Sequence, residues 1–139
     1  MWFPVPDHQR QEPSVIERIH PPEFAQPAVP LSHGVRAGGF LFVSGQTATD
    51  DEGGIYVGDF EREVRGALDN VEAVLRAGGA SVEQVVRVGA YLSNATLFAP
   101  FNAIYAQRFG AAPPARTTVV VDFGHANVRV ELDAVAFLG

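Results

Sequence analysis

The sequence predicts an α+β fold in which two helices cover one face of a β-sheet. Two observations lead to this prediction. Five segments show the alternation or the β-branched runs typical of strands, whereas two segments repeat their apolar residues at the i, i+3, i+4 spacing of an amphipathic helix. Their order along the chain is β, β, α, β, α, β, β. A chain of 139 residues with this order indicates one domain built from a sheet and a helical layer.

Residues 1–28 are predicted to form an extended arm that precedes a domain at residues 29–139. Seven of the ten prolines lie within residues 1–30. Proline fixes φ and lacks a backbone N–H, so this stretch cannot form a regular helix. The segment "SVIERI" at residues 14–19 is the exception, because it could pair as an edge strand.

The domain is predicted to open with two strands and a long helix. In "VRAGGFLFVSGQ" the pair Gly38–Gly39 indicates a turn or bulge before a strand at Phe40–Ser44. Asp59 is a suitable N-cap for the helix, and Gly78–Gly79 a suitable stop. The predicted apolar stripe of this helix consists of Phe60, Val64, Ala67, Leu68, Val71, Val74 and Leu75.

The third strand and the second helix follow. Alternation in "QVVRVGAYLS" predicts a strand, and Pro100–Phe109 is predicted to be helical. The core face of the strand is expected to hold Val86, Val88, Ala90 and Leu92. The buried side of the helix is expected to hold Phe101, Ile104, Tyr105 and Phe109.

Two further strands, "RTTVVVDF" and "VRVELDAVAF", are joined by the short "GHAN" connection. The first is apolar at positions 119, 121 and 123, and its other face holds Val120 beside Arg116, Thr118 and Asp122. The second is apolar at even positions, while Val135 and Phe137 add apolar groups to the opposite face. Since two helices can cover only one face, we expect an oligomer in which sheet faces meet.

Composition excludes several classes of function. The chain has no cysteine, so a disulfide scaffold, a thiolate nucleophile and a cysteine-ligated zinc site are excluded. The four histidines, at positions 8, 20, 33 and 125, show no metal-ligand spacing, and no metal site is predicted. A net charge of −6 argues against nucleic-acid or anionic-membrane partners.

No targeting segment is expected. The first ten residues lack the basic start and apolar core of a secretory signal, and no apolar stretch approaches the roughly 20 residues that span a bilayer. The expected location is the cytoplasm.

Arg116 and Glu131 are charged residues on predicted core strands, where a charge is costly unless it has a partner. The planar guanidinium of Arg116 can bind a carboxylate with two hydrogen bonds, and the carboxylate of Glu131 can activate a water. The alternatives are a structural ion pair of Arg116 with Glu131 or Asp122, and a solvated polar face around Glu131.

Three more residues are candidates for a site. Ser44 and Gly45 end a strong strand, where Gly45 would allow close backbone approach, and Asn102 lies near the start of the second helix. Each also has an ordinary interpretation, as a turn at Ser44–Gly45 and as a local cap at Asn102.

Together these segments resemble the YjgF/RidA family of enamine/imine deaminases, from about residue 29 to residue 137. The resemblance lies in "FLFVSGQ", "ALDNVEAVLRAGGAS", "FNAIYAQRF" and, above all, "PPARTTVVV" followed by "VRVELDAVA". It implies a chorismate-mutase-like mixed sheet with two helices on one face, a homotrimer with sites in clefts between subunits, and no cofactor.

The resemblance also implies roles for individual residues. Arg116 would bind the substrate carboxylate, Glu131 would position the attacking water, and Ser44, Gly45 and Asn102 would line the site. The chain departs from the family at two positions. Leu31 stands where active members usually have a tyrosine. Thr118, whose hydroxyl can still bind a water, stands where they often have a cysteine.

The implied reaction is hydrolysis of reactive 2-imino acids, such as 2-iminobutanoate or 2-iminopropanoate, to 2-keto acids and ammonia. One alternative is a trimeric module that binds keto-acid-like carboxylates without turnover, since Leu31 removes a hydroxyl. Another is an endoribonuclease or translation inhibitor, which the acidic charge and the absence of lysine disfavour.

Overall fold

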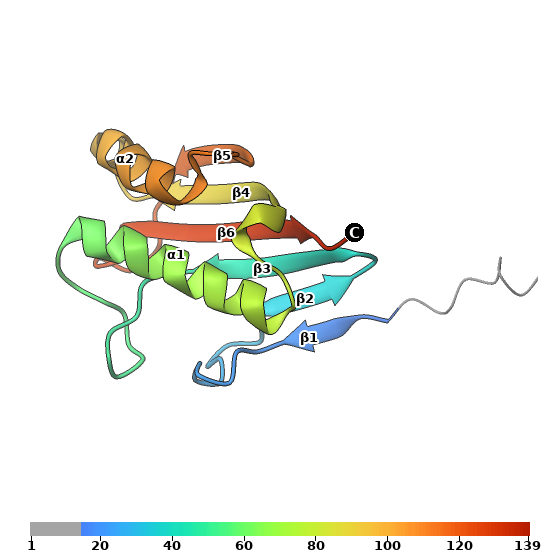
Figure 1. The fold of residues 1–139 in the computed structure, drawn as a ribbon. Helices are drawn as coiled ribbons and strands as arrows, with labels where there is room; N and C mark the ends of the chain where they lie inside the picture. The colour runs from blue at the N-terminus through green and yellow to red at the C-terminus, as the bar shows by residue number, and fades with distance from the viewer. Residues whose placement is uncertain (1–14) are drawn as a thin grey trace, which may run out of the picture.

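The computed structural model describes residues 15–139, which form a six-stranded sheet with two helices in front of one face (Figure 1). The strands are β1 (Glu17–Ile19), β2 (Gly34–Ala37), β3 (Phe40–Gln46), β4 (Val85–Leu92), β5 (Ala115–Val120) and β6 (Val130–Phe137). The helices are α1 (Phe60–Ala77) and α2 (Phe98–Phe109), and the 3₁₀ turns η2 (Val82–Gln84) and η3 (Ala95–Leu97) precede β4 and α2. The predicted α+β fold is confirmed.

The sheet order is β1-β2-β3-β6-β4-β5, with β1 and β5 at the edges. Only β4 and β5 pair in parallel, so the sheet is mixed. The predicted edge strand corresponds to β1; Ser14 and the earlier part of the arm lie outside the described residues. Strands β5 and β6 are close in sequence but do not pair, because β4 lies between them.

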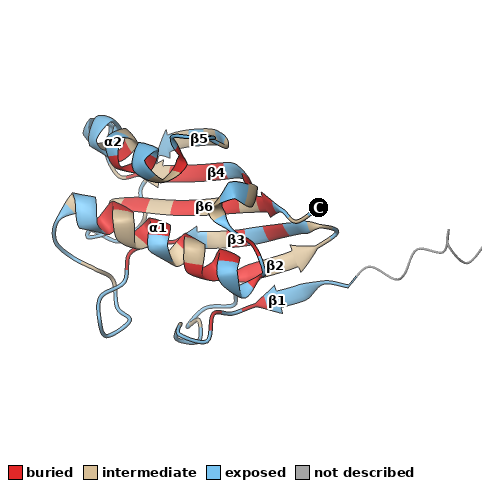
Figure 2. Ribbon diagram, viewed as in Figure 1, coloured by how far each residue is buried: buried red, intermediate tan, exposed pale blue. Residues whose placement is uncertain are grey.

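Helix α1 begins and ends where the sequence predicts. The Asp59 carboxylate accepts a hydrogen bond from the N–H of Arg62 at 3.0 Å, and Gly79 has a φ of 81°, which ends the helix. Every residue of the predicted stripe except the partly buried Phe60 is buried against the sheet (Figure 2).

Helix α2 begins at Phe98, two residues before the predicted start, because η3 leads directly into it. All four residues predicted for its buried side are buried. Across residues 15–139 neither helix is long and apolar enough to cross a membrane.

The predicted core face of β4 is wrong at one position. Val86 is 44% exposed, and Val85 is buried in its place. The pairing of β4 with β6 shifts register between Val85 and Arg87, where β4 contains one extra residue. Such a bulge reverses the direction of the side chains that precede it.

The apolar positions of β5 do not form the face that points to the core. Arg116 pairs with Val88, which is buried, so the face that holds Arg116 and Thr118 is turned toward the helices. Val119, one of the apolar positions, pairs with Tyr91 and is 40% exposed. The strand also ends at Val120 and not at 123. As an edge strand beside α2, β5 needs no continuous apolar face of its own.

The face of the sheet away from the helices is apolar and exposed in the single chain, as the sequence predicts. Phe40, Phe42 and Phe137 are each at least 38% exposed on neighbouring strands. The rings of Phe40 and Phe137 lie 5.4 Å apart between centroids. We call this set the open-face aromatic cluster.

Candidate functional site

A bulge in β3 brings Ser44 and Gly45 against β6. Between Val43 and Gln46 the pairing with β6 shifts register, so β3 contains one extra residue there. The Ser44 backbone N–H donates to the His33 carbonyl at 2.9 Å, and its hydroxyl donates to the Ser32 carbonyl. The Ser44 side chain therefore anchors the segment that precedes β2.

Gly45 lies directly against the carboxylate of Glu131. A Cβ added at Gly45 would come within 1.9 Å of Oε1 of Glu131, which is far inside van der Waals contact. Glycine is therefore required here for close approach, as the sequence suggests, and the group that approaches is the Glu131 side chain.

Leu31 lies near the same end of β3. It is 46% exposed and directly precedes Ser32, the residue that accepts the Ser44 hydroxyl. The structure therefore brings Leu31, Ser44, Gly45 and Glu131 to one end of the sheet.

Glu131 lies on the open face of the sheet, opposite Tyr91 on β4. Partial burial, and to a lesser degree the neighbouring Asp133 carboxylate, raise the pKa of Glu131. Asp133 accepts hydrogen bonds from the Gly89 N–H at 3.0 Å and from the Tyr91 hydroxyl at 2.8 Å. Glu131 is thus a carboxylate of increased basicity on a polar patch of an otherwise apolar face.

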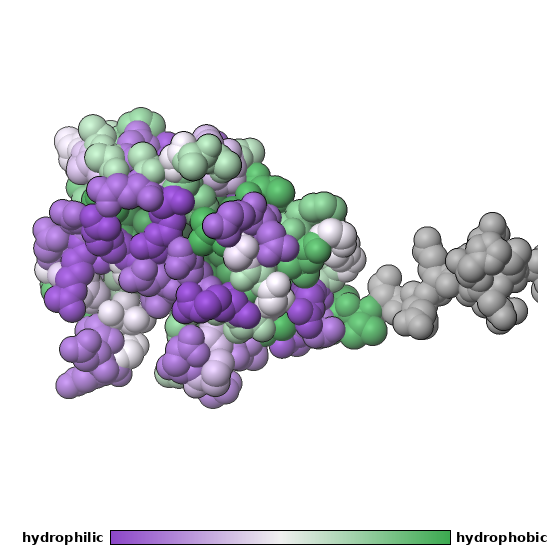
Figure 3. All heavy atoms as spheres, viewed as in Figure 1, coloured by the Kyte–Doolittle hydropathy of each residue, from purple (hydrophilic) through white to green (hydrophobic). Residues whose placement is uncertain are grey.

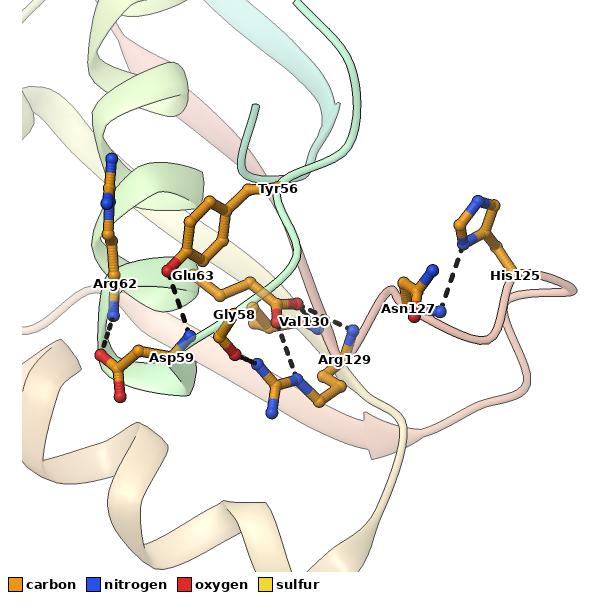
Figure 4. Close-up of polar contacts among 9 residues, drawn as sticks. All are labelled: Tyr56, Gly58, Asp59, Arg62, Glu63, His125, Asn127, Arg129 and Val130. Carbon is orange, nitrogen blue, oxygen red and sulfur yellow. Dashed lines mark hydrogen bonds and ion pairs between the residues drawn. The ribbon is translucent and has the colours of Figure 1, made fainter. Parts of the chain in front are cut away.

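An ion pair between the buried Glu63 and the partly exposed Arg129 fixes the backbone just before Glu131 (Figure 4). The carboxylate of Glu63, on α1, is 2% exposed and accepts hydrogen bonds from the N–H groups of Arg129 and Val130 at 2.8 and 3.2 Å. It also accepts from Nε of Arg129 at 2.8 Å, and Arg129 donates to the Gly58 carbonyl. We call this set the Glu63–Arg129 clamp.

The clamp was not predicted from the sequence, although a signal was present. Glu63 follows Phe60 by three residues and precedes Ala67 by four, so it belongs to the apolar stripe of α1. A charged residue inside such a stripe needs a buried partner.

Arg116 lies at the edge of the sheet under α2. Its Nη2 donates to Oδ1 of Asn102 at 2.7 Å. Its Cζ lies 4.7 Å from the ring centroid of Tyr105 and 5.3 Å from that of Phe101, both within cation–π distance. No carboxylate within residues 15–139 lies at ion-pair distance from Arg116, so the structural pairs considered with Glu131 and Asp122 are not formed.

Thr118 shares the face of Arg116. It pairs with the buried Ala90, and its hydroxyl is buried without a hydrogen-bond partner among the described residues. Asn102 binds Arg116 and does not act as a local cap. Arg116, Asn102 and Thr118 thus form a second group, on the helical side of the sheet.

The two groups point to opposite faces of the same sheet. Arg116 pairs with Val88, on the core side, and Glu131 pairs with Tyr91, on the open side. The pairing positions differ by three residues along β4 and by two strand spacings, which separates the two backbones by about 14 Å. One small ligand cannot contact both side chains of the same chain.

A hollow of about 300 Å³ adjoins Arg116. It is lined by Asn102, Tyr105, Ala106, Phe109, Gly110, Pro113, Pro114 and Arg116. We call it the α2 groove. Apart from the guanidinium, the Asn102 amide and the Tyr105 hydroxyl, its side chains are apolar.

A larger hollow, of about 420 Å³, lies between α1, η2 and α2. Its arginines already have acidic neighbours, since Arg108 lies 3.0 Å from Asp69 and Arg76 lies 3.9 Å from Glu72. It is therefore less suited than the α2 groove to bind a carboxylate ligand. Among residues 15–139 no group of three or more His, Cys, Asp or Glu side chains is placed to hold a metal ion.

Comparison with known proteins matches most of the chain to one family. The family model described as Endoribonuclease L-PSP matches residues 23–138. A RutC family protein of Pyrococcus horikoshii is 38% identical over 113 residues, which cover 81% of this chain and 90% of that protein. A RutC family protein of Aquifex aeolicus is 35% identical over 123 residues, covering 87% and 98%.

Solved structures give the same result. The YjgF product of E. coli matches with a TM-score of 0.79 and 28% identity, covering 87% of this chain and 98% of that one. The structure of E. coli TdcF with bound serine matches with a TM-score of 0.80 and 28% identity, covering 88% and 99%.

Proposed function

Because the chain belongs to the Endoribonuclease L-PSP family, which includes the RutC and YjgF/Rid proteins, we propose that it hydrolyses reactive 2-imino acids to 2-keto acids and ammonia. 2-Iminobutanoate and 2-iminopropanoate are the simplest candidates. The observation that carries the proposal is the guanidinium of Arg116, which is held by Asn102 and aromatic rings and faces no carboxylate within residues 15–139.

The reaction uses two subunits. Arg116 and Glu131 of one chain lie on opposite faces. This supports a cleft between subunits that combines Arg116 of one subunit with Glu131 of its neighbour. The open-face aromatic cluster supports such an assembly, since exposed apolar patches of this kind mark interfaces. We propose a homotrimer, in which each cleft is made in the same way.

Arg116 binds the substrate carboxylate through charge-assisted hydrogen bonds, worth roughly 1.5–3 kcal/mol each. Glu131 accepts a proton from a water as the water oxygen attacks the electrophilic imine carbon. The C=N bond becomes a single bond, and Glu131 gives the proton to the nitrogen. The hydroxyl proton of the tetrahedral adduct then passes to Glu131 as the C–N bond breaks, which forms the ketone and releases ammonia. General-base assistance of this kind typically contributes ~10²–10⁴-fold to the rate. The hydroxyl of Thr118 lies on the same face as Arg116, and in the proposed assembly it would hold a water there once the site admits one.

Other observations support a small-molecule site. A solved relative, TdcF, binds serine, which carries an α-carboxylate. The net charge of −6 and the absence of lysine disfavour an RNA substrate despite the family's name. No cofactor is needed, since a protonated imine is already an electrophile.

The test is imine hydrolysis in the presence of semicarbazide. 2-Iminopropanoate is generated in situ, and semicarbazide traps whatever the enzyme does not hydrolyse. Wild type should reduce the amount of trapped product, and Arg116→Ala should not. Arg65→Ala is the matched control, because Arg65 lies on α1 and pairs with Glu61 outside the site. Equal trapping with and without wild type, across several imino acids, would reject the deaminase proposal and leave carboxylate binding without turnover.

A further inference from the structure

The α2 groove is a mainly apolar hollow that ends at a cationic group. Its walls are Tyr105, Ala106 and Phe109 on α2 and Pro113–Pro114 before β5. Arg116 follows Pro114 by two residues and lines the same hollow. Figure 3 shows a mixture of apolar and polar residues along the top of the molecule, over α2 and β5, in contrast to the strongly hydrophilic band over α1.

The size of the groove exceeds what the smallest imino acids need. Its volume of about 300 Å³ is at the lower end of that of ordinary ligand pockets. The side chain of a 2-imino acid begins two bonds from the carboxylate carbon. A carboxylate bound to Arg116 therefore brings that side chain to the start of the groove. The methyl group of 2-iminopropanoate would leave most of the hollow filled with water.

The residues that line the α2 groove favour an apolar side chain on the substrate. Away from the Arg116–Asn102 end, the only polar side-chain group is the Tyr105 hydroxyl, and this hydroxyl is buried and out of reach of a ligand. A charged or strongly polar side chain would lose its hydration there without replacement. A branched or aromatic hydrocarbon side chain would bury its surface against Phe109 and the two prolines.

We propose that the α2 groove binds the substrate side chain, so that this protein acts preferentially on 2-imino acids with extended apolar side chains, such as those of leucine or phenylalanine. The turnover part of this inference rests on the proposed function. The binding part does not, because it requires only Arg116 and the groove.

The first experiment compares kcat/KM for the imines derived from alanine, leucine and glutamate. Each buried methylene contributes about fourfold, so the leucine-derived imine should exceed the alanine-derived one by at least about tenfold. The glutamate-derived imine should be the poorest of the three.

The second experiment changes the groove. Ala106→Phe fills it from an exposed helical position, and should reduce the ratio of leucine-derived to alanine-derived kcat/KM by about tenfold. Ala103→Phe is the matched control, on the same helix but outside the groove, and should leave the ratio unchanged. Circular dichroism checks that both variants fold.

Binding of 2-keto acids distinguishes the groove assignment from the deaminase proposal. Titration calorimetry with pyruvate and with 4-methyl-2-oxopentanoate should show tighter binding of the latter by at least about tenfold, and Ala106→Phe should reduce this difference. If neither imine is turned over but this binding preference is found, the deaminase proposal fails and the groove assignment stands. If the alanine-derived imine and pyruvate are favoured, or if Ala106→Phe changes no ratio, the groove assignment is wrong.

Discussion

At the scale of single residues, the contact between Gly45 and Glu131 decides where the carboxylate can lie. Glu131 Oε1 occupies the position that a side chain at residue 45 would fill. We therefore expect Gly45→Ala to displace the carboxylate and to reduce kcat by about 10²-fold, the lower end of what a general base contributes. Steady-state kinetics with the preferred imine measure this. Gly54→Ala, in a surface turn with a nearest approach of 3.1 Å to Asp50, is the control and should retain activity.

A second prediction at this scale concerns pH. The pKa of Glu131 is raised above its ordinary value of 4.5, by burial and by Asp133. As a base Glu131 must be deprotonated, so kcat/KM should fall on the acid side at a pH above 4.5. Asp133→Asn removes the neighbouring negative charge and should move this fall to lower pH. A pH profile that is unchanged in Asp133→Asn would contradict the assignment of Glu131 as the base.

The same pKa shift has a consequence for stability. Because the pKa is higher in the folded chain, the folded state holds this proton more tightly than the unfolded state. The contribution of Glu131 to stability is therefore greatest below pH 4.5 and is lost as pH rises through the raised pKa. Glu131→Gln should consequently gain in melting temperature relative to wild type at pH 7, and gain less at pH 4. Differential scanning calorimetry at the two pH values measures this.

At the scale of elements, the Glu63–Arg129 clamp joins the first turn of α1 to the start of β6. Loss of the Glu63 carboxylate leaves the backbone N–H groups of Arg129 and Val130 and the Nε of Arg129 without their acceptor. Glu63→Ala should reduce the free energy of unfolding by about 2–4 kcal/mol. It should also reduce kcat, because the strand that holds Glu131 loses its anchor.

The control for the clamp is on the same helix. Glu61→Ala removes an exposed carboxylate that pairs with Arg65 at 2.7 Å, and should cost less than about 1 kcal/mol. Urea denaturation of both variants gives the comparison. If both variants lose the same free energy of unfolding, the buried contacts of Glu63 contribute no more to stability than the exposed pair of Glu61.

At the scale of the whole molecule, the proposed site depends on assembly. Phe42→Arg places a charge in the open-face aromatic cluster and should dissociate the oligomer and abolish turnover together, because each site would lose one of its two contributing chains. Val57→Arg changes a more exposed apolar residue outside the sheet, and should neither dissociate the oligomer nor abolish turnover. Sedimentation velocity measures the oligomeric state, and the trapping assay measures turnover.

Complementation tests the shared site directly. Arg116→Ala and Glu131→Gln should each be inactive. When the two variants are unfolded and refolded together in equal amounts, about a quarter of the clefts combine an intact Arg116 with an intact Glu131, and about a quarter of the activity should return. If the mixture stays inactive although mixed oligomers form, each site takes both residues from one chain.

The sequence alone determined the features that depend on neighbouring residues. The N-cap at Asp59, the apolar stripe of α1, the turn at Gly38–Gly39 and the buried side of α2 follow from local conformational preferences and from helical or strand periodicity. The sequence also suggested the candidate site residues, through the resemblance carried by "PPARTTVVV" and "VRVEL". The roles of their residues stay predictions.

Only the tertiary structure decided how these features meet. The bulges near Val86 and Gly45, the face of β5 that holds Arg116, and the partner of Glu63 all depend on pairing between segments far apart in the sequence. Periodicity within one strand cannot reveal an extra residue relative to its neighbour, and it cannot show which face a helix will cover. For this reason the opposite orientations of Arg116 and Glu131, on which the proposed two-chain site rests, became visible only in the folded sheet.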